Sequence, residues 1–233
     1  MITLRRSEDR GHAEHGWLDS YHTFSFSEYQ DRRFMGFSDL RVINEDRVVP
    51  GTGFGTHGHR DMEIITYVLS GAVHHKDSTG GEGILRHGEL QMMSAGSGVQ
   101  HSEKNPSNSE PLHLLQIWIQ PNEFGVKPSY AQQFLDADAL RKGFTKVIAP
   151  KGEDAQFQIH QDARLSIAWA SEGQALEKVL EPQRRYYLHV ATGAVQFGTQ
   201  RLVAGDAAMI DDEAALALTA TADSELLLFD LSR

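Results

Sequence analysis

The chain has 233 residues, 40% of them hydrophobic, which is enough to bury the core of one large domain or of two small ones. Its formal net charge is -10, from 32 acidic and 22 basic side chains, which disfavours direct binding to nucleic acid or to an anionic membrane surface. Cysteine is absent, which excludes disulfide bonds, thiolate nucleophiles and cysteine-based zinc sites. Any bound metal must therefore use nitrogen and oxygen ligands.

The N-terminal segment, Met1–Arg10, is charged where a signal peptide needs an apolar stretch of about 7–15 residues. No apolar run approaches the roughly 20 residues of a membrane-spanning helix. We therefore expect a cytoplasmic protein without a membrane partner, and we expect it to be a monomer.

Strand-like segments dominate the chain. They are short, rich in β-branched, aromatic or aliphatic residues, and separated by Gly, Asn, Asp or Ser. The clearest are Leu40–Ile43, Ile64–Leu69, Leu112–Ile119, Phe157–His160, Leu165–Ala170, Tyr186–Ala191 and Leu226–Leu231. The clearest helix candidate is Asp136–Lys142, which has Asp138 near its start and two basic residues near its end, as the helix dipole favours. This pattern predicts an all-β sandwich or barrel architecture.

The segment Pro121–Gln133 contains two prolines and a glycine, has little apolar periodicity, and is the best linker candidate. We therefore expect two tandem antiparallel β-barrel domains with few short helices, covering residues 1–130 and 131–233.

A weak internal repeat supports this division. A strand, a Gly turn and a second strand around Gly71 recur around Gly193. The Gly-acidic turn that begins at Gly88 likewise recurs at Gly205. One supersecondary unit is thus used twice.

Two pairs of potential metal ligands lie in the first half of the chain. His57 and His59 form an H-x-H pair, and His101 and Glu103 form an H-x-E pair. In a strand, residues i and i+2 point to the same face, so each pair offers two ligand atoms on one side of a sheet. Three imidazoles and one carboxylate suit a first-row divalent metal. Such a set leaves coordination positions open, which is typical of a reactive site.

The second repeat lacks this ligand set. Counted from the matching glycines, the equivalent positions hold Val179, Glu181, Leu218 and Ala220. The contrast predicts a metal-binding N-terminal barrel and a degenerate C-terminal barrel without metal ligands.

The residues around the ligand pairs resemble the two motifs of the cupin superfamily. The first is Gly51-x5-His57-x-His59-x3-Glu63-x7-Gly71, and the second is Gly96-x-Gly98-x2-His101-x3-Asn105. Beyond the superfamily, the N-terminal half is similar to the bacterial pirins, through His15–Phe26, Met35–Asn44, Phe54–Glu63 and Met93–Glu103. The C-terminal half resembles them only in the order of its elements.

The resemblance implies a bicupin fold with a single metal in the N-terminal barrel. The residues through which pirins bind that metal fall here on His57, His59, His101 and Glu103. Glu63, in contrast, occupies a position that is a ligand in many other cupins but not in pirins. By resemblance the metal is expected to be Fe(II), with Mn, Ni, Cu, Co or Zn as alternatives.

Two functional hypotheses stay open. Some pirins act as quercetin 2,3-dioxygenases, which cleave the heterocyclic ring of a flavonol with O2 and release CO. In that case Glu103 is both metal ligand and general base. The alternative is a non-catalytic metal-binding regulator that binds a protein partner, either a transcription factor or a metabolic enzyme.

Other conspicuous residues have ordinary structural interpretations. Glu63 is expected either to orient an imidazole of the site or to be a solvated carboxylate at a strand end. Of the remaining first-half histidines, His74 and His87 are expected at hairpin edges, while His75 and His113 are weak candidates for groups behind the ligands. Packing, with no ligand role, is expected for Trp17, Phe24, Phe26 and Phe37. In the second half we expect hydrogen-bonded histidines at His160 and His189 and a solvated strand start at Arg184 and Arg185.

Overall fold

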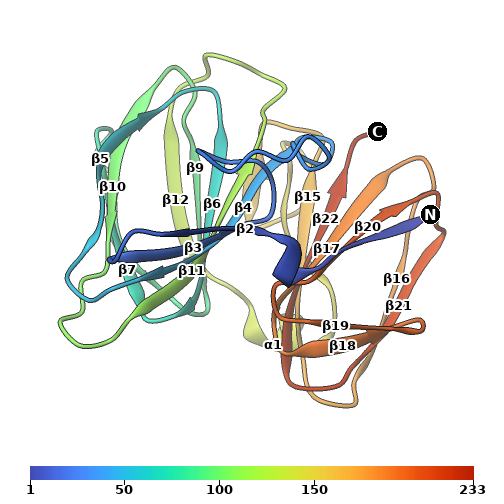
Figure 1. The fold of residues 1–233 in the computed structure, drawn as a ribbon. Coiled ribbons are helices and arrows are strands. Elements are labelled where there is room, and N and C mark those ends of the chain that lie inside the picture. The colour runs from blue at the N-terminus through green and yellow to red at the C-terminus, as the bar shows by residue number, and fades with distance from the viewer. The chain divides into compact units, whose positions relative to one another are not determined.

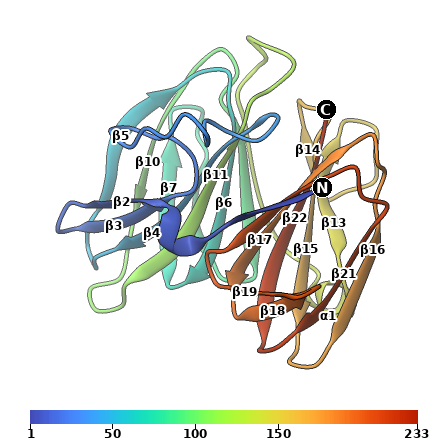
Figure 2. The ribbon, with the colours of Figure 1, turned by 45° about the vertical axis from the view of Figure 1, so that its right-hand side comes forward.

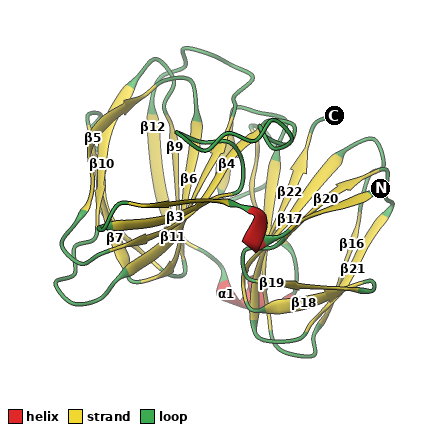
Figure 3. Cartoon of the chain, in the orientation of Figure 1, coloured by secondary structure: helices red, strands yellow, loops and turns green.

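The computed structural model describes residues 1–233, and its regular secondary structure is almost entirely β-strand (Figure 3). The chain forms two compact units. The N-terminal unit comprises Gly11–Leu135 with Ile159–Gln161, and the C-terminal unit comprises Met1–Arg10, Asp136–Gln158 and Asp162–Arg233. Each contains one seven-stranded and one four-stranded sheet (Figure 1), which confirms the predicted all-β, two-barrel class. No helix is long and apolar enough to span a membrane.

The seven-stranded sheet of the N-terminal unit runs, in spatial order, through β12 (Ser129–Phe134), β9 (Glu89–Ser94), β6 (Glu63–Ser70), β11 (Leu112–Ile119), β4 (Leu40–Val48), β3 (Leu18–His22) and β2 (Gly11–Glu14). The facing four-stranded sheet runs through β5 (Gly53–His59), β10 (Val99–Lys104), β7 (Ala72–Asp77) and β8 (Glu82–Arg86).

The C-terminal unit repeats this arrangement. Its larger sheet runs through β1 (Ile2–Arg5), β20 (Ala207–Asp211), β17 (Arg185–Thr192), β22 (Ser224–Leu231), β15 (Arg164–Ala170), β13 (Thr145–Pro150) and β14 (Phe157–Ile159). Its smaller sheet runs through β16 (Ala175–Val179), β21 (Ala215–Ala220), β18 (Ala194–Phe197) and β19 (Gln200–Val203). The only helical segments are a 3-10 turn, Ser7–Asp9, and α1 (Ala137–Lys142).

The sheets form where the sequence alternates or is continuously apolar. On β21, buried Leu216, Leu218 and Ala220 alternate with exposed residues, as expected of a strand with one face on the core. The central strands β6 and β17 are instead buried at almost every position, so both faces of each strand are covered.

All seven strands expected from the sequence are present, with bounds that differ by a few residues. The expected helix is also confirmed. Asp136 caps it, since its Oδ1 accepts hydrogen bonds from the backbone N–H groups of Asp138 and Ala139, each at 3.1 Å.

The linker predicted at Pro121–Gln133 is wrong in its second half. Residues Ser129–Phe134 form β12, which pairs with β9 along its whole length and so extends the sheet of the N-terminal unit. In the C-terminal unit the equivalent edge, next to β20, is occupied by β1 from the start of the chain, the blue strand beside β20 in Figure 1 that also runs from the label N in Figure 2. An edge strand of this kind pairs with a neighbouring strand on one side only, so its sequence is less typical of a strand.

The predicted repeat is visible in the turns. Gly71, between β6 and β7, has a φ of 77°, and Gly193, between β17 and β18, has a φ of 76°. A Cβ atom on Gly71 would lie 2.5 Å from the carbonyl oxygen of Pro111. Both the left-handed backbone and the close approach therefore require glycine at this turn.

The strand pairing shows that, on the strand that corresponds to β10, the equivalent residues of the two units differ by two positions from those counted in the sequence. Glu103 pairs with His75, four residues after Gly71, whereas the residue four positions after Gly193 pairs with Leu218. Leu218 is thus the structural equivalent of Glu103, whereas the count from the matching glycines points to Ala220. Because the shift is two residues, the face of the strand does not change, and the interior positions in the C-terminal unit are apolar either way.

Candidate metal centre

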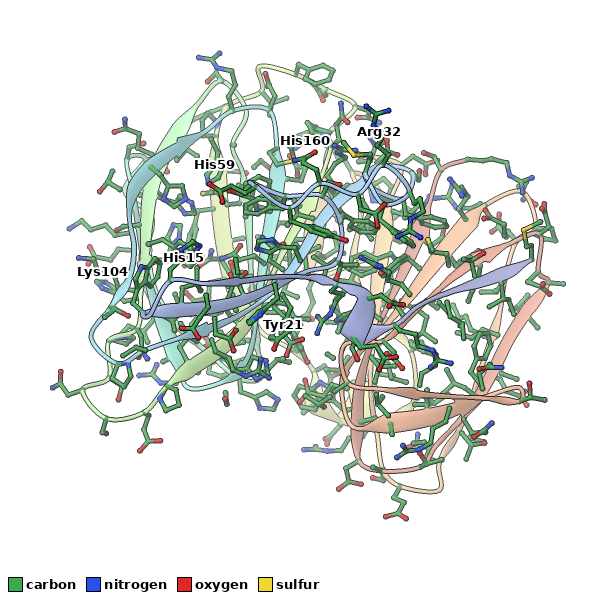
Figure 4. The ribbon with its side chains drawn as sticks, in the orientation of Figure 1. His15, Tyr21, Arg32, His59, Lys104 and His160 are labelled. Atoms are coloured by element: carbon green, nitrogen blue, oxygen red, sulfur yellow. The ribbon has the colours of Figure 1, made fainter.

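The three imidazoles predicted from the sequence come together in the N-terminal unit. His57 and His59 lie on β5 and His101 on the neighbouring β10, directly opposite His57. Their potential ligand nitrogens lie within 4.8 Å of one another, and the Nε2 atoms of His57 and His101 are 3.0 Å apart. His59, labelled in Figure 4, stands edge-on to both rings.

A bulge lies in β5 directly before His57. Between His101 and Glu103 the pairing with β5 shifts from His57 to Phe54, so β5 has one extra residue there. The carbonyl of Gly55, inside the bulge, accepts a hydrogen bond from Nδ1 of His57 at 2.8 Å. This bond places the proton on Nδ1 and leaves Nε2 free to bind a metal.

Burial keeps the imidazoles of His59 and His101 neutral. The pKa of His59 is lowered to about 4, first by burial and then by the neighbouring His101 and His57. The pKa of His101 is lowered to about 3, again first by burial and then by His57. Neutral imidazoles are the form that binds metal, so both are prepared for a ligand role at neutral pH.

Glu103 lies next to this group and is 4% exposed. A ligand oxygen of Glu103 lies within 4.8 Å of ligand atoms of His101 and His75. The larger sheet holds the carboxylate from across the barrel: Thr66 Oγ1 donates to Oε1 at 3.1 Å, and Gln116 Nε2 donates to Oε2 at 2.6 Å. Such donors fix the orientation of a carboxylate for a metal.

Thr66 and Gln116 belong to a polar row across the interior of the larger sheet. The cross-strand pairs join His22 to Asn44, Asn44 to Gln116, Gln116 to Thr66 and Thr66 to Gln91. All five side chains are buried. The sequence signal that could have identified this row is that Asn44, Thr66 and Gln116 each interrupt an apolar strand.

His75, a weak candidate in the sequence, lies close to the site. It is fully buried, directly opposite Glu103, and its Nε2 contacts Asp77 Oδ2 at 3.0 Å. Its ring stacks on Tyr130 at 4.6 Å. Although burial opposes it, hydrogen bonds from His75 and Thr79 lower the pKa of Asp77, so the carboxylate that orients His75 is charged.

The sequence makes His113 as weak a candidate for a group behind the ligands as His75. In the structure His113 contacts Glu45 Oε1 at 2.8 Å and does not line the cavity of the site. The exposed His74 contacts Glu82 at 3.1 Å across the β7–β8 hairpin, as expected of a histidine at a hairpin edge.

Glu63 orients an imidazole, but not one of the predicted ligands. It is 1% exposed, accepts a hydrogen bond from Ser94 Oγ at 2.9 Å, and lies 3.4 Å from Nδ1 of His160. His160, labelled in Figure 4, belongs to the N-terminal unit although it follows the helix in the sequence. Burial is the main reason that the pKa of Glu63 is raised.

A cavity of about 700 Å³ opens over the four predicted ligands. Its apolar walls include Phe26, Tyr29, Phe54 and Trp118, and the Trp118 ring lies edge-on to His59 at 5.0 Å and to Phe26 at 5.5 Å. Phe26 was expected to pack only, so that prediction is wrong for this residue, whereas Phe24 and Phe37 are buried in the core. The cavity has the size and the aromatic lining of a site for a flat organic ligand.

Comparisons with known proteins agree with this geometry. The family model described as Pirin matches residues 3–119, and the model described as Quercetinase C-terminal cupin domain matches residues 146–231. The chain belongs to the pirin family. It is 48% identical over 233 residues to a protein of Escherichia coli K12 named quercetin 2,3-dioxygenase, with 99% of both chains covered.

Two solved structures extend the comparison. The crystal structure of YhhW from E. coli matches with a TM-score of 0.94 at 48% identity, covering 99% of this chain and 97% of that one. The structure of the bacterial pirin YhhW in complex with nickel(II), also from E. coli, matches with a TM-score of 0.93 at 46% identity, covering 100% and 99%. A divalent metal therefore fits both the pirin fold and the donor set found here, with neutral imidazole nitrogens and an oriented carboxylate on one side of a cavity.

Proposed function

We propose that this pirin is a metal-dependent quercetin 2,3-dioxygenase in which His57, His59, His101 and Glu103 hold one divalent transition metal. The observation that carries the proposal is the position of these four side chains in the wall of a cavity of about 700 Å³ with aromatic lining. The names of the full-length relatives support the reaction, and the nickel(II) complex of a relative supports the metal. Fe(II) is proposed as the native metal on the family resemblance, with nickel as the first alternative.

The protein's own residues account for binding and proton transfer. Phe26 and Trp118 give the flat flavonol apolar surface and exclude water from the reacting atoms. Glu103 accepts the proton of the flavonol 3-hydroxyl, and its carboxylate is held ready by Thr66 and Gln116. When bound, the metal supplies Lewis acidity and a meeting point for substrate and O2. Both atoms of O2 enter the opened product, and one ring carbon leaves as CO.

The second barrel has a different proposed role. Leu216 and Leu218 fill the interior positions that correspond to His101 and Glu103, and both are buried in the apolar core of the C-terminal unit. We propose that this unit binds no metal and stabilises the fold.

The test is turnover by protein reconstituted without O2 with Fe(II), Mn(II), Co(II), Ni(II), Cu(II) or Zn(II). After addition of quercetin and O2, loss of the flavonol absorbance and release of CO are followed. We expect turnover with at least one metal, and its loss in His101→Ala and Glu103→Ala. His74→Ala, a change at an exposed histidine outside the cavity, is the matched control and should keep full activity.

If the wild type is inert with every metal but still binds one ion at this site, the dioxygenase proposal fails. The regulatory alternative would then be preferred. Protein that binds none of these metals at His57, His59, His101 and Glu103 contradicts both.

A further inference from the structure

A second polar group lines the cavity besides the four proposed ligands. Ser20 on β3 and Asn44 and Asp46 on β4 all face it, and all three are at most 5% exposed. Ser20 and Asp46 are a direct cross-strand pair, and Asn44 lies two residues before Asp46 on the same face. None of them is needed to hold Glu103, which takes its hydrogen bonds from Thr66 and Gln116.

Asp46 is a buried carboxyl group without a cation. Ser20 Oγ donates to its Oδ1 at 2.5 Å, and no other group of the protein donates to the carboxyl group. Burial, and then the neighbouring carboxyl groups of Glu103, Glu45 and Asp19, raise the pKa of Asp46 to about 7. A buried carboxyl group is costly to a fold, so its presence in a cavity wall indicates a role in binding.

Asn44 gives an independent observation. Its Oδ1 is buried and has no hydrogen-bond partner, although almost all buried polar atoms in proteins have one. The neighbouring Glu45 shows the ordinary case, since it points to the other face of β4 and contacts both His113 and Arg47. The unsatisfied acceptor of Asn44 therefore lies on the cavity side of the strand, beside Asp46.

A hydroxyl group on an aromatic ring matches this wall best. It donates to an unpartnered acceptor such as Asn44 Oδ1, and it also donates to, or accepts from, the carboxyl group of Asp46 according to its protonation. An anionic group is disfavoured by the nearby Glu103 and Asp46 carboxyl groups. The aromatic walls beside it, Phe26 and Trp118, hold the ring that carries the hydroxyl.

We propose that Ser20, Asn44 and Asp46 form a second subsite of the cavity, which binds a phenolic hydroxyl of the substrate other than the one that meets the metal. This inference rests on the proposed function and narrows its substrate class. It makes the protein selective for flavonols that carry hydroxyl groups on their outer rings over flavonols that carry only the 3-hydroxyl.

The experiment measures flavonol binding by absorbance titration of metal-loaded protein without O2, so that no turnover occurs. Quercetin, which has outer-ring hydroxyls, is compared with 3-hydroxyflavone, which has none. The variants are Asp46→Leu and Asn44→Leu, so that the test survives if one of them does not fold. Glu45→Gln is the matched control, because it changes a buried carboxylate on the same strand that faces away from the cavity. Metal content is measured in each preparation.

We expect quercetin to bind about tenfold more weakly to Asp46→Leu and to Asn44→Leu, the usual effect of losing one hydrogen bond in a ligand site. Binding of 3-hydroxyflavone and the metal content should stay unchanged, and Glu45→Gln should behave as the wild type. Equal losses for both flavonols, or no loss for either, overturn the subsite.

The two proposals are separable in this experiment. If quercetin binds in an Asp46-dependent way but is not cleaved when O2 is added, the subsite stands and the dioxygenase proposal fails. If quercetin is cleaved with unchanged affinity in both variants, only the subsite fails. If neither flavonol binds the metal-loaded wild type, both are overturned.

Discussion

At the scale of single residues, the candidate site depends on two neighbouring strands, β5 with His57 and His59 and β10 with His101 and Glu103, because a strand places residues i and i+2 on one face. The structure brings the three imidazoles together and places Glu103 beside His101. The sequence could not show which groups hold Glu103, since Thr66 and Gln116 come from strands whose register depends on the whole sheet. The position of His75 opposite Glu103 depends on strand register in the same way.

The support given to Glu103 leads to a prediction for Gln116→Leu. Its Nε2 donates the shortest hydrogen bond to the carboxylate, at 2.6 Å, and leucine has a similar size without a donor. Loss of such a partner typically weakens metal binding about 10–100-fold. Competition with a chromophoric chelator measures the change, and Gln120→Ala, at an exposed position on the next loop, should leave the affinity as it is.

Asp46 leads to a prediction about stability and pH in the metal-free protein. Its pKa is 3.8 in an unfolded chain and about 7 in the fold. Below about pH 4 the group is protonated in both states and contributes nothing. As the pH rises from about 4 to about 7, the unfolded chain loses this proton while the folded chain keeps it, so the group increasingly destabilises the fold. Above about pH 7 the destabilisation is constant, on the order of 4 kcal/mol.

We therefore expect Asp46→Asn to unfold at higher urea concentration than the wild type at pH 8, and at nearly the same concentration at pH 4. Urea unfolding of both proteins after removal of metal with a chelator checks this. A difference between the two proteins that is the same at both pH values would contradict the buried, protonatable state of Asp46.

At the scale of elements, strands with a strong apolar pattern were predicted correctly, whereas the polar edge strand β12 was not. The strands Ile64–Leu69 and Leu112–Ile119 are mostly apolar, and both lie at the centre of their sheet. The strand Ser129–Phe134 is polar and half exposed, so its sequence resembles a loop, and only its pairing with β9 makes it a strand. The bulge in β5 was also invisible, because glycines in a strand are equally typical of a turn.

That bulge leads to a prediction for Gly53→Ala. Gly53 has a φ of 153°, and a Cβ atom there would lie 2.3 Å from the backbone oxygen of Glu103 and 2.5 Å from the Cα of Lys104. We expect the variant to lose roughly 1–3 kcal/mol of stability, the usual cost of such backbone strain, and to bind metal more weakly because β10 is displaced at Glu103.

The matched control is Gly55→Ala, on the same strand, where a Cβ atom would meet nothing within 4 Å. Thermal unfolding and metal titration of the two variants give the comparison. Equal behaviour of Gly53→Ala and Gly55→Ala would show that the close contact between β5 and β10 does not position Glu103.

At the scale of the whole molecule, one supersecondary plan is used twice with different interiors. Four neighbouring strands of the larger sheets correspond in order, β9-β6-β11-β4 in one unit and β20-β17-β22-β15 in the other, and the turns at Gly71 and Gly193 have nearly the same φ. One interior is polar and carries the proposed ligands, whereas the other is filled by leucines such as Leu216 and Leu218. Counting residues from the matching glycines predicted this contrast, although the count for the positions of His101 and Glu103 differs by two residues from the observed strand pairing.

The contrast leads to a prediction about metal stoichiometry. We expect elemental analysis of the purified protein to give one equivalent of transition metal per chain, and His57→Ala and His101→Ala to reduce it to a trace. His189→Ala, a change at a buried histidine of the C-terminal unit, should leave the equivalent in place, because Leu216 and Leu218, at the positions of that unit that match His101 and Glu103, offer no donor atoms. A second equivalent that persists in His101→Ala and disappears in His189→Ala would show that the C-terminal unit has kept a metal site of its own.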